Sequence, residues 1–266
     1  MPQTTGSASP RAEGRPLVLG HRGASADAPE NTLAAFRLAL AQGADGVELD
    51  VWRCATGEVV VFHDEDTARL TGVPLTVPDA PLPALRALDV GAHRGARFAG
   101  ERIPRLEEVL EALPGAVVNV ELKARRRRPD LELAPAVARV LRGGNTAGRV
   151  VVSSFDHRLV VAFRLAAPEI PVGLLVEAEH PRPLLTALAT RLLRPAAIHP
   201  DRRLVTPARA RGWIARGLAV NVWTVDDPEE ARRLATLGAS AIITNVPGRI
   251  RAALTPSPAS RTPSPP

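Results

Sequence analysis

The chain has 266 residues, of which 45% are apolar and 23% are charged, with a formal net charge of +6. That length and composition suit one large soluble domain, and no apolar run is long enough to cross a bilayer. The single cysteine, Cys54, excludes an internal disulfide and suits a reducing compartment. Residues 1–16 lack the apolar core of a secretory signal, so we predict a cytoplasmic protein with a flexible lead and no stable membrane insertion.

Arginine supplies almost all of the positive charge, because lysine occurs only once, at Lys123. Aromatic residues make up 3% of the chain and tyrosine is absent, so platforms for stacking nucleic-acid bases are scarce. The four adjacent arginines Arg125–Arg128 are typical of a solvated turn. We therefore expect no nucleic-acid partner, although the positive charge would attract a substrate that carries phosphate.

Polar residues follow the first two predicted strands. The first strand ends at His21 and Arg22, and the second carries Glu48 and Asp50. Residues two apart on a strand point to the same face, so the two carboxylates should project together. Because charged groups are costly to bury without a partner, this grouping indicates a functional site rather than a packed core.

A hairpin is predicted directly after the second strand. Thr56 and Gly57 favour a turn, and Glu58–Phe62 reads as a returning strand. A hairpin centred near Thr56 would pair residue 50 with about residue 63. This pairing would place His63 beside Asp50, so local geometry alone would bring the imidazole to the acids.

Predicted strands alternate with predicted helices along the chain. The strands are expected at residues 17–20, 46–51, 117–122, 149–154, 171–176, 196–199, 218–223 and 240–244. The helices are expected at residues 31–42, 131–142, 157–167, 207–216 and 228–237. This alternation favours a parallel sheet closed into a single (β/α)₈ TIM barrel over residues 17–254. No glycine-rich phosphate loop follows any strand, which argues against an open doubly wound sheet.

Two segments interrupt or follow this pattern. Residues 65–103 are rich in Pro and Gly, and we expect a small insertion there, after the second strand and its hairpin. Such a loop either helps to form the site or is a surface excursion. Residues 255–266 are rich in Pro and Ser and are predicted to be a disordered tail.

The third barrel strand carries Glu121 and Lys123 on one face, at the end where barrel active sites are built. A compact ammonium is not interchangeable with a guanidinium, so the one lysine of an arginine-rich chain indicates a requirement at its position. Glu48, Asp50 and Glu121 form an oxygen-only set that suits one Mg²⁺ or Ca²⁺ ion.

A competing assignment concerns the two histidines. Imidazole suits zinc, so His21 and His63 could be zinc ligands together with the carboxylates. Histidine is equally suited to supply an acid and a base near neutral pH. The residue types alone leave both assignments open.

Several motifs occur in an order and spacing that resemble the glycerophosphodiester phosphodiesterase family. They are HRG, PENT, ELD, VVFHD, ELK, SSF and NVWTV. The resemblance implies a TIM barrel that hydrolyses glycerophosphodiesters to glycerol 3-phosphate and an alcohol with a bound metal ion. It favours His21 and His63 as general acid and base, and leaves open which is which. It also leaves open whether water or the glycerol 2-hydroxyl attacks phosphorus.

The resemblance further implies which residues bind the substrate. Arg22 and Lys123 would hold phosphate oxygens, and the pocket for the small-molecule substrate would be lined by Phe155, Asn221 and Trp223. Asn245 stands where the family commonly has aspartate, which leaves the role of that position open. His199, at the end of the sixth strand, has no evident partner and is interpreted as structural.

Two other functions are compatible with the same chain. The first is a related phosphodiesterase that acts on lysophospholipids or sphingolipids in the manner of a phospholipase D, for which the apolar stretch Val73–Leu88 would provide a rim. The second is a barrel that binds its ligand without catalysis, which the presence of both histidines and all three acids disfavours. The sequence does not distinguish Mg²⁺ from Ca²⁺, and it identifies neither the head group of the substrate nor the oligomeric state.

Overall fold

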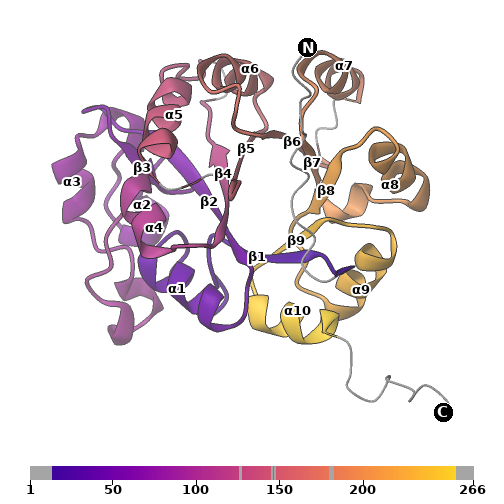
Figure 1. Ribbon diagram of the computed structural model, residues 1–266. Coiled ribbons are helices and arrows are strands. Elements are labelled where there is room, and N and C mark those ends of the chain that lie inside the picture. Colours follow the sequence, from indigo (N-terminus) through magenta and orange to yellow (C-terminus); the bar gives the residue numbers. More distant parts are fainter. Residues whose placement is uncertain (1–13, 126–127, 145, 147, 180–182, 256–266) are drawn as a thin grey trace.

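The computed structural model describes residues 14–125, 128–144, 146, 148–179 and 183–255. Within these residues nine strands form one sheet in the order β1-β9-β8-β7-β6-β5-β4-β2-β3, and β1 also pairs with β2 (Figure 1). The strands are β1 (Leu17–His21), β2 (Gly46–Arg53), β3 (Val59–Val61), β4 (Val117–Leu122), β5 (Val150–Ser154), β6 (Val172–Val176), β7 (Ala197–Pro200), β8 (Ala219–Val222) and β9 (Ala241–Thr244). All of them except β3 run parallel, so the eight parallel strands close into a barrel and confirm the (β/α)₈ prediction.

Helices surround the barrel between its strands (Figure 1). They are α1 (Leu33–Ala41), α2 (Ala68–Thr71), α3 (Leu82–Ala87), α4 (Leu106–Ala112), α5 (Leu133–Gly143), α6 (His157–Ala166), α7 (Pro183–Leu193), α8 (Pro207–Ile214), α9 (Pro228–Thr236) and α10 (Pro247–Leu254). The five helices expected from periodicity correspond to α1, α5, α6, α8 and α9, each within two residues at either end. None of the described helices combines the length and apolar character needed to cross a lipid bilayer.

Side-chain caps define where several helices begin. Thr32 accepts a hydrogen bond from Ala35 N at the start of α1. Asp156 caps α6 in the same way. Asp227 caps α9, and the proline at the first position of that helix gives up no hydrogen bond because the first N–H has no intrahelical partner. These local signals explain why the helical segments could be placed from the sequence.

The barrel strands are buried on both faces. Outward-facing residues such as Val47, Leu49 and Val120 pack under the helices. A small apolar cluster fills part of the barrel interior and includes Leu17, Leu19, Ala241 and Ile243. This double burial explains why the strands appear in the sequence as continuous β-branched runs.

The hairpin after β2 differs from its expected register by one residue. The observed pairs include Val51 with Val61 and Arg53 with Val59, so the pairing continues to residue 62 opposite residue 50. Phe62 N accordingly donates to Asp50 O at 3.0 Å. His63 is the next residue after this pair, and because Phe62 turns into the apolar side of the hairpin, His63 projects toward the acids.

Residues 65–103 contain α2 and α3 together with three short 3₁₀ helices, η2 (Val77–Asp79), η3 (Ala92–Arg94) and η4 (Ala96–Phe98). Leu70, Val77 and Leu85 pack with Phe62 in an apolar cluster of their own. The segment is therefore an ordered insertion with its own small core. Residues 1–13 and 256–266, which hold most of the predicted lead and tail, lie outside the described residues.

Candidate functional site

Three buried carboxylates meet on two neighbouring strands. Glu48 and Asp50 come from β2 and Glu121 from β4, and the register places Asp50 opposite Glu121. Their relative exposures are 4%, 1% and 8%. One carboxylate oxygen from each lies within 4.8 Å of the others. Among the described residues this is a ready set of oxygen donors for one metal ion.

The charges on these acids are strongly interdependent. Burial, together with the neighbouring Asp50 and Glu121, raises the pKa of Glu48 well above its ordinary value. Burial also raises the pKa of Glu121. Although burial opposes ionisation of Asp50 too, Lys123 and Arg22 hold the pKa of that carboxyl below its usual range. An additional positive charge among the three would relieve this repulsion.

Two cationic side chains border the acids. Lys123 Nζ lies 3.0 Å from Asp50 Oδ1 and 2.9 Å from Glu121 Oε1. These carboxylates raise the pKa of Lys123 against the effect of burial, so the ammonium stays charged. Arg22 Nε lies 3.3 Å from Asp50 Oδ2. The Arg22 backbone has a φ of 55°, and its N–H donates to Glu48 Oε2 at 3.1 Å.

The segment between β1 and α1 supplies two residues that the sequence interpretation did not assign. Asn31 is buried at 2% exposure, and its Nδ2 donates to Asp50 Oδ2 at 2.8 Å. Glu30 Oε1 accepts from Arg22 NH1 at 3.0 Å. Both residues belong to the PENT motif. The motif contributed to the family resemblance, but neither residue was given a role from it.

His21 is held in one orientation by Asn245. Its Nδ1 lies 2.8 Å from Asn245 Oδ1, and its Nε2 lies 3.9 Å from Glu48 Oε2. Burial and the neighbouring Arg22 lower the pKa of His21 from 6.5 to about 4. At neutral pH the ring is therefore uncharged, with one nitrogen protonated and the other bare.

Asp226 decides which nitrogen of His21 carries the proton. Its carboxylate accepts from Asn245 Nδ2 at 2.7 Å and from Asn245 N at 2.8 Å. A carboxylate can only accept, so the amide NH₂ of Asn245 must face Asp226 and the amide oxygen must face His21. That oxygen also accepts from Ser25 Oγ at 2.8 Å. His21 consequently donates through Nδ1, and its bare Nε2 lies toward the acids.

His63 has a charged partner instead. Its Nδ1 lies 2.7 Å from Asp64 Oδ1. Burial lowers the pKa of His63, while the carboxylates of Asp50 and Asp64 oppose that shift. The carboxylate behind Nδ1 stabilises the protonated ring, which suits His63 to donate a proton from its other nitrogen.

Two aromatic rings stand at the barrel mouth. The Phe155 and Trp223 rings pack edge to face, with centroids 5.5 Å apart. Trp223 Nε1 donates to His199 O at 2.7 Å, which orients the indole. Asn221 lies deeper in the barrel, where its Nδ2 is 3.1 Å from Nε2 of the fully buried His199. The structure thus gives His199 the partner that the sequence did not reveal.

The space for the His199 ring is made by a glycine. A Cβ at Gly173 would lie 2.4 Å from His199 Nε2, so any side chain there would displace the ring. Burial lowers the pKa of His199 to about 3. His199 is therefore a neutral part of the barrel interior, as its interpretation as a structural residue implied.

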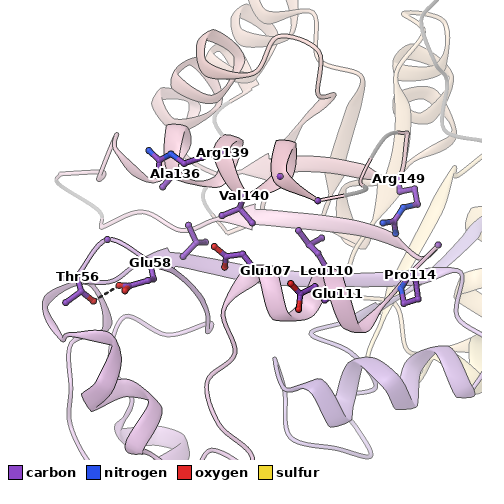
Figure 2. Close-up of a pocket in the computed structure, with 15 residues that line it drawn as sticks. Thr56, Glu58, Glu107, Leu110, Glu111, Pro114, Ala136, Arg139, Val140 and Arg149 are labelled. Atoms are coloured by element: carbon purple, nitrogen blue, oxygen red, sulfur yellow. Dashed lines mark hydrogen bonds between the residues drawn. The ribbon is translucent and has the colours of Figure 1, made fainter.

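Two further features lie away from the acids. Arg125 forms ion pairs with Glu65 and Asp79 of the insertion, whereas residues 126–127 of the arginine run lie outside the described residues. A groove of about 1020 Å³ runs between the hairpin turn, α4 and α5 (Figure 2). Its lining includes Glu58, Glu107 and Arg139, and it shares no residue with the site described above.

Comparisons with known proteins agree with this geometry. Residues 21–249 match the model of the glycerophosphoryl diester phosphodiesterase family. A glycerophosphodiester phosphodiesterase of Caldanaerobacter subterraneus subsp. tengcongensis is 36% identical over 237 residues, which is 87% of this chain and 94% of that protein. A probable glycerophosphodiester phosphodiesterase of Mycobacterium tuberculosis is 35% identical over 90% of this chain and 92% of its own length.

A solved structure gives the corresponding comparison in space. A phosphodiesterase of Oleispira antarctica, in complex with the product sn-glycerol-3-phosphate, superposes with a TM-score of 0.83 and is 31% identical. The match covers 90% of this chain and 96% of that one. The shared architecture therefore extends over nearly the whole of both chains.

Proposed function

Because the chain belongs to the glycerophosphoryl diester phosphodiesterase family, we propose that it splits a glycerophosphodiester into glycerol 3-phosphate and an alcohol. It is a phosphoric diester hydrolase, as its relatives are. The observation that carries the proposal is the meeting of Glu48, Asp50 and Glu121 beside two cations and two histidines. That the Oleispira antarctica relative holds sn-glycerol-3-phosphate as its product supports the same product here.

We assign a divalent cation, Mg²⁺ or Ca²⁺, to the three carboxylates. Their oxygens lie within 4.8 Å of one another, and neither histidine belongs to the set. Burial and the neighbouring acids raise the pKa values of Glu48 and Glu121, and a cation bound among the three carboxylates would favour their ionised forms. When bound there, the cation would supply Lewis-acid stabilisation of the charge on the phosphate oxygens.

We infer the roles of the two histidines from their hydrogen bonds. His21 has a bare Nε2 and a low pKa, so it is the general base that accepts the proton of the attacking hydroxyl. We propose His63 as the general acid: although burial lowers its pKa, the Asp64 carboxylate at Nδ1 favours the protonated ring that this role requires. The proton on His63 Nε2 passes to the oxygen of the leaving alcohol as the bond from phosphorus to that oxygen breaks. The attacking oxygen belongs to water or to the glycerol 2-hydroxyl.

The remaining site residues bind the substrate. Arg22 and Lys123 would hold phosphate oxygens, since both cations border the acids where the phosphate must lie. Phe155 and Trp223 would form the wall against which the glycerol carbons pack. Asn221, whose Nδ2 lies 3.1 Å from His199 Nε2, would line the same pocket below this wall.

Release of glycerol 3-phosphate from a panel of glycerophosphodiesters tests the proposal. The purified protein would be assayed on choline, ethanolamine and glycerol diesters, before and after treatment with EDTA. Activity should disappear with EDTA and return on addition of Mg²⁺ or Ca²⁺. Undiminished turnover in metal-free buffer would reject the cation assignment. Cleavage of lysophosphatidylcholine without cleavage of any glycerophosphodiester would favour the lysophospholipid alternative.

A further inference from the structure

A surface arginine of the insertion joins the two sides of the site. Arg69, in α2, donates from NH1 and NH2 to the two carboxylate oxygens of Glu30, at 3.1 and 2.6 Å. Its Nε donates to Asp64 Oδ2 at 2.5 Å. Because Glu30 also binds Arg22 and Asp64 also binds His63, one guanidinium connects a phosphate-binding residue with a catalytic one.

Arg69 affects Arg22 through its contact with Glu30 and His63 through its contact with Asp64. Glu30 Oε1 is shared between Arg22 NH1 and Arg69 NH2. Arg69 therefore compensates part of the negative charge of Glu30, and it holds the carboxylate in the position where Arg22 binds it. Asp64 presents one oxygen to His63 and the other to Arg69, so its carboxylate plane is set from both sides. A planar guanidinium can bind both oxygens of one carboxylate and, through Nε, one oxygen of a second, a geometry that the single nitrogen of an ammonium does not offer.

We propose that Arg69 is a positioning residue that orients Arg22 through Glu30 and His63 through Asp64. The segment after β3 is then a working part of the site and not a surface excursion. The proposal rests on the proposed function for what Arg22 and His63 do, but the coupling between the side chains stands on contacts alone.

Arg69→Ala should lower kcat about tenfold and raise KM about tenfold, since small displacements of positioned groups cost on the order of 10² in kcat/KM. Arg69→Lys should recover little, because it cannot reach both acids. Arg142→Ala is the matched control. Arg142 is 52% exposed against 48% for Arg69, and its Nε and NH2 likewise hold both oxygens of one carboxylate, that of Glu169. The control should leave both constants within about twofold.

Variants of Glu30 and Asp64 can separate the effects of the two Arg69 contacts. In Glu30→Gln, adding Arg69→Ala should lower kcat with little further change in KM. In Asp64→Asn, the same addition should raise KM with little further change in kcat. In the Glu30→Gln, Asp64→Asn double variant, it should change neither by more than about twofold. An undiminished Arg69→Ala effect in that double variant would overturn the proposal, as would Arg69→Ala kinetics equal to wild type.

A measurement without turnover distinguishes this inference from the proposed function. In ¹⁵N-histidine NMR spectra, the His63 Nδ1 proton should be protected from exchange in the wild type and in Arg142→Ala. It should exchange rapidly in Arg69→Ala. If the wild type released no glycerol 3-phosphate but this contrast held, the proposed function would fail and the coupling of Arg69 to His63 would stand. Equal protection in Arg69→Ala and wild type would reject that coupling.

Discussion

Replacing Asp226 with asparagine should impair catalysis even though Asp226 acts only through Asn245. One Asp226 oxygen accepts from Thr244 Oγ1 and from the backbone N–H of Asn245, both at 2.8 Å. Because a backbone N–H can only donate, that position must stay an oxygen in Asp226→Asn. The new NH₂ group then faces Asn245 Nδ2, across the present distance of 2.7 Å. Two donors facing each other would force the amide of Asn245 to turn over.

The turned amide would present its NH₂ to His21. Nδ1 of His21 would then have to accept, and its proton would move to Nε2, the atom that must be bare in a base. Keeping Asn245 in its original orientation would leave a buried donor unsatisfied, at about 1–3 kcal/mol. That free energy would lower the population of the His21 tautomer with a bare Nε2 by roughly 5- to 150-fold. We therefore expect kcat/KM to fall by up to about 10²-fold, within the usual contribution of a general base.

Kinetics of glycerol 3-phosphate release would measure the loss, and a second substitution should reverse it. In Asp226→Asn, Asn245→Asp, the carboxylate at position 245 accepts from the new amide, from His21 Nδ1 and from Ser25, so the original tautomer returns. Asp227→Asn is the neighbouring control, because asparagine caps a helix as well as the aspartate that now caps α9. Wild-type kinetics in Asp226→Asn would refute the reasoning, and so would a double variant no more active than the single one.

Three further predictions concern individual side chains. His21→Ala and His63→Ala should each lower kcat by about 10²–10⁴-fold with metal affinity retained, and a large loss of affinity, measured by calorimetry, would make that histidine a ligand. Lys123→Arg should lose much of kcat/KM and Lys123→Met more, on the order of 10²-fold, whereas wild-type kinetics in Lys123→Arg would mean that the residue merely neutralises the acids. His199 has a folded-state pKa of about 3 against 6.5 in the unfolded chain, so the unfolded state takes up this proton first as the pH falls. The free energy of unfolding should therefore drop by about 2 kcal/mol between pH 7 and pH 5 on its account. Urea denaturation should show a shallower pH dependence in His199→Gln, and equal dependence in both proteins would contradict the assignment.

Much of the fold could be predicted from the sequence because its signals are local. All eight barrel strands lie within two residues of their expected positions, since strands buried on both faces appear as continuous β-branched runs. The pairing of Glu48 with Asp50 follows from the two-residue period of a strand. The barrel helices α4, α7 and α10 and the insertion helices α2 and α3 were not among those expected, and residue 62 lies opposite Asp50 where about residue 63 was expected.

The orientation of the site residues could be decided only by the tertiary structure. His21 and Asn245 are 224 residues apart, and they meet because β9 pairs with β1 when the barrel closes. Arg69 reaches Glu30 across 39 residues, from an insertion whose folding follows no repeating pattern. The sequence determined which groups the strands bring together, because the strand period and burial impose a pattern on neighbouring residues. It did not determine which nitrogen of His21 is bare, because a hydrogen bond between side chains far apart in the sequence imposes no such pattern.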